Sequence, residues 1–169
     1  MNTLSQPDAN FVDPSDRAQA ISMARQLLKG NNPGVLSTVD ESGSPQSRWM
    51  ATTSFEDFPN LYTLTAANSR KVAQIREHPI VQWMFTDPDF GFVVNLTGRA
   101  QLFLRDTETM KRVWDQIADK SRAYFMNATL DSPGFVVIHT RVEAVELAIP
   151  KRVLSFVIDP QELAAIPGS

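Results

Sequence analysis

The most suggestive group of reactive side chains lies in the stretch Leu64–Lys71, where a predicted strand ends and a predicted helix begins. Free backbone N–H groups and the positive end of a helix dipole meet at such a junction. Here Thr65 and Ser69 add two hydroxyls, and Arg70 and Lys71 add two positive charges. This combination suits a terminal phosphate group. The alternative is that Ser69 only caps the helix and that Arg70 and Lys71 are solvated surface residues.

A third cation, Arg48, lies inside the strand predicted at residues 46–53, which reads QSRWMATT. Alternation along a strand sends Arg48 and Met50 to one face and Trp49 to the other. If that face points into a barrel or a dimer cleft, Arg48 requires an anion. The alternative is an arginine of an edge strand that is solvated or paired with an acid such as Asp57.

The remaining reactive side chains form no recognisable catalytic or metal-binding group. His78 closes the predicted helix and His139 is isolated on a predicted strand, so neither has the companions that a metal site or a nucleophilic triad requires. Glu143 and Glu146 are three positions apart in a predicted strand, which places them on opposite faces and argues against paired carboxylates. We therefore expect no catalytic side chain and no bound metal.

These side chains require a scaffold of short strands and few helices. Helices are predicted at residues 13–29, 69–77 and 106–117 from their caps, apolar faces and end signals, with Gly30 ending the first. Strands are predicted at residues 34–39, 46–53, 61–65, 80–86, 90–104, 135–149 and 153–158, with Gly98 marking a bulge or a bend at a barrel corner. The short connections favour antiparallel hairpins, and six or seven such strands close into a barrel or a sandwich.

Composition and charge restrict the class of protein. The 169 residues, 43% of them apolar, suffice for one domain, which we place at residues 13–169 after a polar lead-in at residues 1–12. The net charge of −3 argues against nucleic-acid binding, which needs many cations. The sequence has no cysteine, no apolar run long enough to span a membrane, and no N-terminal pattern of a signal peptide. These features predict a cytoplasmic protein.

The order of the motifs resembles the flavin-binding signature of the pyridoxamine-phosphate-oxidase superfamily. Its members have an arginine-containing strand, then a threonine, then Ser-Arg-Lys opening a helix that ends in Asn-Pro. The corresponding residues here are Arg48–Met50, Thr65, Ser69–Lys71 and His78-Pro79. Within the superfamily the chain is most similar to the general-stress-protein-26-like branch, through Gly34, Leu36, Thr38, Gly98, Ala100 and Trp114. The similarity extends over roughly residues 18–147.

This resemblance implies a mainly β fold with flanking helices: an antiparallel six- or seven-stranded split β-barrel. It also implies a homodimer with two FMN molecules at the subunit interface. Carried over position by position, Arg70 and Lys71 would bind the FMN phosphate. Ser69 and Arg48 would assist them, and Thr65 would reach the flavin or its ribityl chain.

The resemblance says less about the isoalloxazine ring. The backbone around Arg48, Trp49 and Met50 would contact the edge of the ring, because its alternating donors and acceptors match those of a strand. From the partner subunit, Gln82 and Trp83 would lie near the ring. The alternative for Trp83 is the barrel core.

The implied function is that of an FMN-dependent, stress-related oxidoreductase with an unidentified small-molecule substrate and NAD(P)H as a candidate donor. From Leu147 onward the chain lacks the Arg-x-His element with which true pyridoxamine-phosphate oxidases bind their substrate, so oxidation of vitamin B6 is not expected. A non-catalytic FMN carrier or redox sensor is the main alternative. A same-fold binder of haem or a deazaflavin, and a module without any cofactor, are the others.

Overall fold

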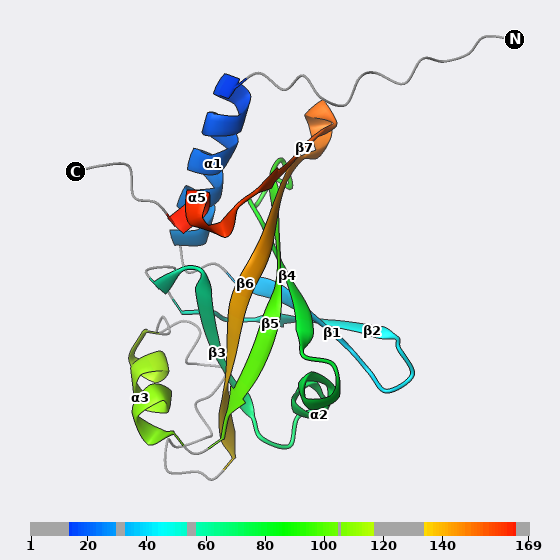
Figure 1. The fold of residues 1–169 in the computed structure, drawn as a ribbon, viewed down its shortest axis with the longest axis vertical. Coiled ribbons are helices and arrows are strands. Elements are labelled where there is room, and N and C mark those ends of the chain that lie inside the picture. Colours follow the sequence, from blue (N-terminus) through cyan, green and yellow to red (C-terminus); the bar gives the residue numbers. More distant parts are fainter. Residues whose placement is uncertain (1–13, 30–32, 54–56, 105, 117–133, 165–169) are drawn as a thin grey trace, which may run out of the picture.

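The computed structural model describes residues 14–29, 33–53, 57–104, 106–116 and 134–164 (Figure 1). Its elements are, in chain order, α1 (Pro14–Lys29), β1 (Gly34–Val39), β2 (Pro45–Met50), β3 (Asn60–Ala66), α2 (Arg70–Glu77), β4 (Ile80–Thr86), β5 (Val93–Phe103), α3 (Thr107–Gln116), β6 (Phe135–Ile149), η3 (Pro150–Arg152), β7 (Leu154–Ile158) and α5 (Pro160–Ala164). The predicted lead-in at residues 1–12 and the helix stop at Gly30 lie outside the described residues. Within the described ranges, no helix is long and apolar enough to cross a membrane.

The seven described strands form one antiparallel sheet, which confirms a mainly β split barrel with flanking helices. Their order is β2-β1-β4-β5-β6-β3, and β7 pairs with the second half of β6. The two ends of this order meet, because the Thr53 N–H donates to the Tyr62 carbonyl over 3.0 Å and the Thr63 hydroxyl donates to the Ala51 carbonyl. The chain that leaves β2 therefore runs along β3 and closes the barrel.

Alternate strand positions fill the interior of the barrel. In β4, Val81, Trp83 and Phe85 are buried, whereas the residues between them are exposed. Trp83 is 1% exposed, and its indole N–H donates to the Thr140 hydroxyl over 3.1 Å. Because the one polar atom of the side chain is satisfied inside the apolar interior, Trp83 is a core residue.

A β-bulge lies where β5 pairs with β6, at the predicted position. Gly98 pairs with Val142 and the residue before it pairs with Ala144, so Glu143 is an extra residue in β6. The two strands are so close that a Cβ atom at position 98 would lie 2.2 Å from the carbonyl oxygen of Arg141. Glycine is required there because any side chain would meet backbone.

The bulge corrects the expectation for Glu143 and Glu146. Val142 and Val145 are both buried, and the two glutamates are both exposed. The extra residue shifts the inside-outside alternation by one position, so the carboxylates do not lie on opposite faces. They have different partners, since Glu143 lies 3.9 Å from Arg99 and Glu146 accepts a hydrogen bond from Ser155 over 2.8 Å.

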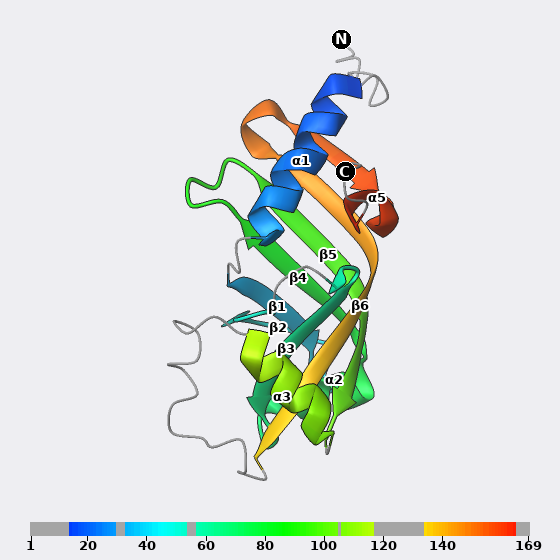
Figure 2. The ribbon, with the colours of Figure 1, turned by 90° about the vertical axis from the view of Figure 1, so that its left-hand side faces the viewer.

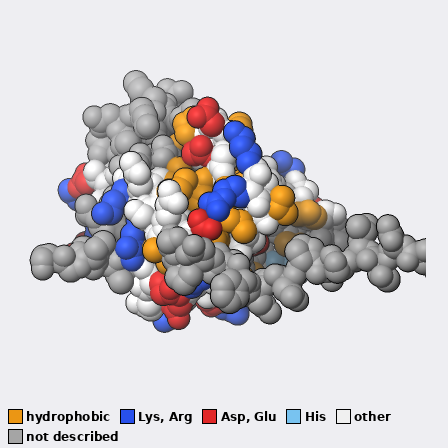
Figure 3. Space-filling model, turned by 90° about the horizontal axis from the view of Figure 1, so that it is seen from above, with side chains coloured by type: hydrophobic (Ala, Val, Ile, Leu, Met, Phe, Trp, Pro, Cys, Tyr) orange, Lys and Arg blue, Asp and Glu red, His pale blue; other side chains and the backbone are white. Residues whose placement is uncertain are grey.

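Helix α1 packs across one end of the sheet beside α5 (Figure 2). Its buried face joins the main core. Arg17 forms an ion pair with Glu162 at 2.9 Å, and Arg25 Nε donates to the carbonyl of Leu163 over 3.0 Å, so both contacts hold α1 against α5. Seen from this end, acidic and basic side chains are interspersed (Figure 3). The described residues that are visible at this end therefore show charges of both signs and no patch of one sign.

Helix α3 covers the outer face of β3 and β6, where it forms a second apolar cluster. Leu64, Val113 and Val137 are buried in this cluster, and Tyr62 and Trp114 pack against it. The sheet at β3 and β6 is thus buried on both faces, which explains why β3 shows almost no exposed position.

Gly98→Ala should lower the free energy of unfolding by about 2–3 kcal/mol, because the added methyl group meets the backbone of β6 rather than a movable side chain. The matched control is Gly91→Ala, where the nearest atom to the added carbon would be an Asp87 carboxylate oxygen at 3.5 Å. The control should change stability by less than about 0.5 kcal/mol. Urea unfolding measures both effects, and equal losses in the two variants would contradict the bulge argument.

Candidate functional site

The predicted strand-to-helix junction is present between β3 and α2. Ser69 is the N-cap of α2, with extended backbone angles of −71° and 145°, but its side chain makes no capping hydrogen bond. Its hydroxyl lies instead 3.3 Å from the Thr65 hydroxyl. The reading of Ser69 as a plain side-chain cap is therefore wrong. The first turn of α2 keeps N–H groups that no side chain of the described residues satisfies, which is the arrangement an anion uses.

Lys71 points back across this junction toward β3. Its ammonium group donates to the Thr65 hydroxyl over 2.9 Å. Burial lowers the pKa of Lys71 below its ordinary value, and the positive charges of Arg48 and Arg70 lower it further. Because the charges of Arg48 and Arg70 act on Lys71, the three cations lie close enough to repel one another.

Arg48 reaches the same place from β2 through polar but uncharged partners. One guanidinium nitrogen donates to the Thr38 hydroxyl over 2.6 Å, and the other donates to the side-chain carbonyl of Gln74 over 3.2 Å. Thr38 also donates to Gln74 over 2.6 Å, so the three side chains form a closed network. Burial is the main cause that lowers the pKa of Arg48, followed by repulsion from Arg70.

The alternative partner suggested for Arg48 is engaged elsewhere. Asp57 accepts from Arg112 at 2.8 Å, on the side of the barrel that α3 covers. Among the described residues, no carboxylate lies within ion-pair distance of Arg48, Arg70 or Lys71. The reading of Arg48 as an arginine paired with Asp57 is therefore wrong, and none of the three cations has an ion-pair partner among the described residues.

Arg70 is the most exposed of the three cations. It also borders a cavity of about 310 Å³ that Asp40, Glu41 and Glu77 line. None of these carboxylates pairs with it within the described ranges. Arg70 can therefore turn toward an anion at the start of α2 without breaking an ion pair.

Two hydroxyls that the sequence analysis did not assign follow the strand that carries Arg48. Thr52 and Thr53 come directly after β2, and both hydroxyl oxygens are buried without a hydrogen-bond partner among the described residues. A buried hydroxyl without a partner is unfavourable, and in native proteins it is expected to have one. These atoms are available to a bound group. Only the position of the two threonines after Arg48–Met50 could have pointed to them.

The other predicted site residues are divided between two faces of the sheet. Met50 is partly buried against the core, on the side of Arg48. Trp49 is 64% exposed on the outer face. It pairs with Val35, and Ser37, two positions further along the same strand, pairs with Gln82. The exposed side chain of Gln82 therefore lies on the same face as Trp49. Trp83 is buried in the core. The structure thus brings together Arg48, Thr65, Ser69, Arg70 and Lys71. The contacts predicted for the backbone of Trp49, and for Gln82 and Trp83 of a partner subunit, stay predictions.

The two histidines lie apart from this site. His78 is the C-cap of α2, as predicted, and His139 on β6 stacks on Tyr62 with ring centroids 4.7 Å apart. In the part of the chain that the structure describes, no three His, Asp or Glu side chains are grouped as metal ligands.

Comparison with known proteins agrees with this architecture. The family model described as "Pyridoxamine 5'-phosphate oxidase" matches residues 22–148. No curated protein matches the sequence. Among solved structures, a Clostridium acetobutylicum protein related to general stress protein 26 of B. subtilis is 14% identical, with a TM-score of 0.72 over 86% of this chain and 97% of that chain.

Two further solved structures share the fold. A haem-binding protein from Mycobacterium smegmatis is 18% identical, with a TM-score of 0.68 over 91% of this chain and 62% of that chain. An F420 reductase is 21% identical, with a TM-score of 0.56 over 72% of this chain and 94% of that chain. The names of these neighbours therefore span more than one cofactor on a single fold.

The uncompensated charge at the site leads to a prediction about stability. The pKa of Lys71 in the folded chain lies below the ordinary value of 10.5, so the unfolded chain binds this proton more tightly. Protonated Lys71 then opposes folding at pH 7, and wild-type stability should rise as the pH increases toward 10.5. Lys71→Met should raise the free energy of unfolding of the ligand-free protein at pH 7 by about 0.5 kcal/mol.

Urea unfolding at pH 7 and near pH 10 measures this effect, and the gain should shrink at the higher pH. Lys29→Met is the control, because it makes the same substitution at an exposed position at the end of α1. A Lys71→Met variant that is less stable than the wild type at pH 7 would contradict the argument.

Proposed function

This chain belongs to the pyridoxamine 5'-phosphate oxidase family, and we propose that it binds FMN with the phosphate held between β2, β3 and α2. The observation that carries the proposal is the group of three cations, Arg48, Arg70 and Lys71, which has no ion-pair partner among the described residues. A phosphate monoester brings close to two negative charges at neutral pH and several acceptor oxygens. It would convert the repulsion among these cations into attraction.

The side chains around the cations fit a phosphate and a polyol chain. Thr65 and Ser69 offer hydroxyls within 3.3 Å of each other, and the first-turn N–H groups of α2 have no side-chain cap. The buried hydroxyls of Thr52 and Thr53, both without a described partner, follow directly after β2, the strand that carries Arg48. We assign these two threonines to the ribityl chain or the ring edge of the flavin.

The outer face of the sheet supports the proposal of a homodimer. Trp49 is 64% exposed, Met84 is 37% exposed, and both pair with Val35 across neighbouring strands, which makes a continuous apolar row. An exposed row of this kind favours a protein partner. A second copy placed there would bring its own Gln82 near the flavin, while Trp83, being core, is left out of the proposed site.

In this proposal the chemistry belongs to the cofactor and the chain provides position and charge. Bound FMN would supply hydride transfer to or from a small molecule. Arg48, Arg70 and Lys71 would fix the phosphate, and the Thr38–Gln74 pair would hold Arg48 in place. No side chain is assigned as an acid or base. We propose an oxidoreductase of the cytoplasm whose substrate is a small molecule other than pyridoxamine phosphate.

The two histidines of this chain favour FMN over haem as the ligand. A haem iron needs an axial ligand such as a histidine. The ring of His139 is stacked on Tyr62, and its Nε2 is already bonded to Asn60 at 2.9 Å. His78 is exposed at the end of α2. A deazaflavin that carries a phosphate would use the same cations as FMN, so absorbance spectra of the loaded protein separate the two.

The double substitution Arg70→Ala/Lys71→Ala should weaken FMN binding by about 100-fold, because each charge-assisted hydrogen bond contributes on the order of 1.5–3 kcal/mol. Riboflavin, which lacks the phosphate, should bind wild type and variant within about threefold of each other. Arg76→Ala, an exposed cation at the end of α2, is the control. Flavin fluorescence quenching measures the affinities, and an unchanged FMN affinity in a folded double variant would overturn the phosphate site.

Turnover is tested separately by anaerobic addition of NADPH or NADH to the FMN-loaded protein. If the chain is an oxidoreductase that uses a nicotinamide, the flavin absorbance near 450 nm should bleach, on the order of once per second, as is typical of slow enzymes. Flavin that stays oxidised with both nicotinamides, yet is bleached by dithionite, would favour the carrier or redox sensor instead.

A further inference from the structure

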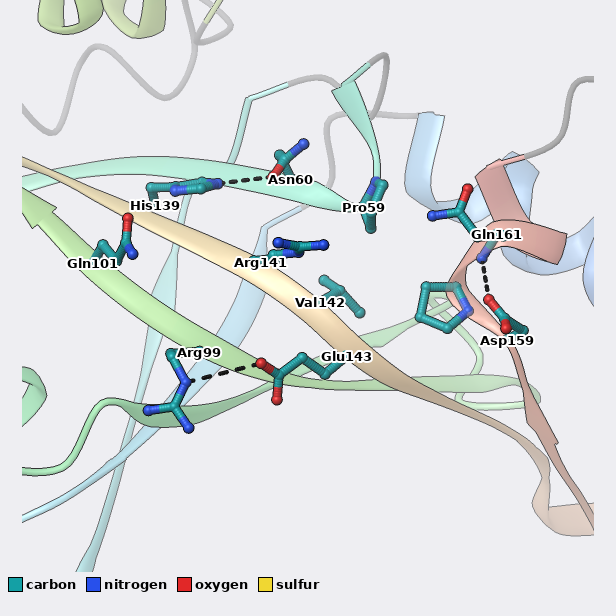
Figure 4. A pocket seen from close by; sticks show the side chains of 11 residues that line it. Pro59, Asn60, Arg99, Gln101, His139, Arg141, Val142, Glu143, Asp159 and Gln161 are labelled. Carbon is teal, nitrogen blue, oxygen red and sulfur yellow. Dashed lines mark hydrogen bonds and ion pairs between the residues drawn. The ribbon is translucent and has the colours of Figure 1, made fainter.

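A second cavity, larger than the one beside Arg70, lies on the other side of the barrel. Its volume is about 860 Å³, and it is bordered by the start of β3, the middle of β5 and β6, and the turn from β7 into α5 (Figure 4). None of the residues proposed for the FMN phosphate lines it. Its volume is within the range of small-molecule sites.

Cross-strand pairing arranges the polar side chains of this cleft in two rows. Asn60 of β3, Arg141 of β6 and Arg99 of β5 are direct neighbours in one row. His139 and Gln101 are neighbours in the next. Two like charges directly opposite each other on a sheet are unfavourable unless something compensates them.

Of the charged side chains that line the cleft, Arg141 is the one without a partner among the described residues. Arg99 lies 3.9 Å from Glu143, a loose pair, and the Asp159 carboxylate accepts from the backbone N–H of Gln161 over 2.7 Å at the start of α5. Within the described ranges, neither a carboxylate nor any other hydrogen-bond acceptor pairs with the Arg141 guanidinium, and Figure 4 shows it without a dashed line to a neighbour. The donors of Arg141 are therefore available to a ligand.

The backbone that carries Arg141 is fixed in place. The carbonyl of Arg141 is the atom that a side chain at Gly98 would strike, because β5 and β6 approach most closely at the bulge. Bulges of this kind often occur beside functional sites, where they redirect a side chain. Arg141 thus projects from a rigid strand rather than from a loop, which suits the binding of a ligand.

Asn60 adds an oriented donor beside Arg141. Its side-chain oxygen lies 2.9 Å from Nε2 of His139, and burial together with the charges of Arg112 and Arg141 lowers the pKa of His139. A neutral ring that donates from Nε2 leaves the Asn60 oxygen as acceptor and its amide hydrogens free. The cleft therefore offers hydrogen-bond donors next to an unpaired positive charge.

We propose that this cleft binds a small organic anion, a carboxylate or a phosphate ester, whose charged group is held by Arg141 and the side-chain amide of Asn60. Gln101 and Gln161, which also line the cleft, would bind polar groups on the rest of the ligand. Arg99 would add a second cation once its loose contact with Glu143 is given up. The site is separate from the proposed FMN phosphate site and does not depend on it.

The test is titration of the full-length protein with succinate and with inorganic phosphate, at constant ionic strength, while the side-chain Nε–Hε signals of the arginines are followed by NMR. Binding with a dissociation constant of about 1 mM should shift the signal of Arg141. The titration is repeated on Arg70→Ala/Lys71→Ala, in which the other cation group is removed. The shift of Arg141 should persist there, whether or not FMN binds to the wild type.

Arg141→Gln should weaken binding about tenfold or more, because it removes the charge but keeps a polar side chain, and Arg141→Lys should restore part of the affinity. Arg76→Gln, which does not line the cleft, should bind as the wild type does. These three variants should melt as the wild type does, because Arg76 and Arg141 are both exposed. Succinate that shifts the Arg141 signal more than phosphate does would identify a carboxylate ligand, and the reverse a phosphate ester.

Three results would overturn the proposal. One is an Arg141 signal that does not move at about tenfold higher anion concentrations, as expected if a second copy of the chain covers the cleft. Another is an affinity that Arg141→Gln leaves unchanged. The third is binding that disappears in Arg70→Ala/Lys71→Ala, which would place the anion at the start of α2.

Discussion

The confinement of three positive charges at one end of the barrel is the constraint on which the rest of the structure depends. Arg48, Arg70 and Lys71 repel one another, and two of them are partly buried, where water screens the repulsion less. Neutral groups hold them in place: the hydroxyls of Thr38 and Thr65 and the side-chain carbonyl of Gln74. Because neutral partners leave the charges uncompensated, the site retains its attraction for an anion. The apolar core must then supply the stability that the site does not.

Much of the scaffold follows from local rules in the sequence. Strand alternation placed Arg48 and Trp49 on opposite faces, and the N-cap position and the stop residue of α2 were expected at Ser69 and His78. Gly98 was expected at a bulge and lies in one. Each of these rests on the conformational preference of a few adjacent residues, so no knowledge of distant contacts was needed. The signature that led to the family uses the same short stretches.

The features that could not be predicted all depend on contacts between distant segments. The face of the sheet on which Glu146 lies depends on the bulge in β6, and the bulge is recognised only from the pairing of β6 with β5. Gln74 lies inside the helix predicted at residues 69–77, but its role as partner of Thr38 and Arg48 requires α2 to lie over the β1–β2 hairpin. Asp57 was a reasonable partner for Arg48 by sequence distance, yet α3 supplies Arg112 to it. The unpartnered hydroxyls of Thr52 and Thr53 are visible only when the burial around them is known.

The pairing of β3 has a consequence for the newly synthesised chain. Residues 60–66 of β3 take their sheet partners from residues 135–141 of β6, which leave the ribosome much later. Pairings between such distant segments form slowly, because a long loop must close first. A nascent chain that ends before β6 would already contain Ser69, Arg70 and Lys71 but would lack the strand that holds Thr65 against them. The ability to capture an anion at α2 is therefore acquired only after β6 has been synthesised, long after the residues that bind the anion.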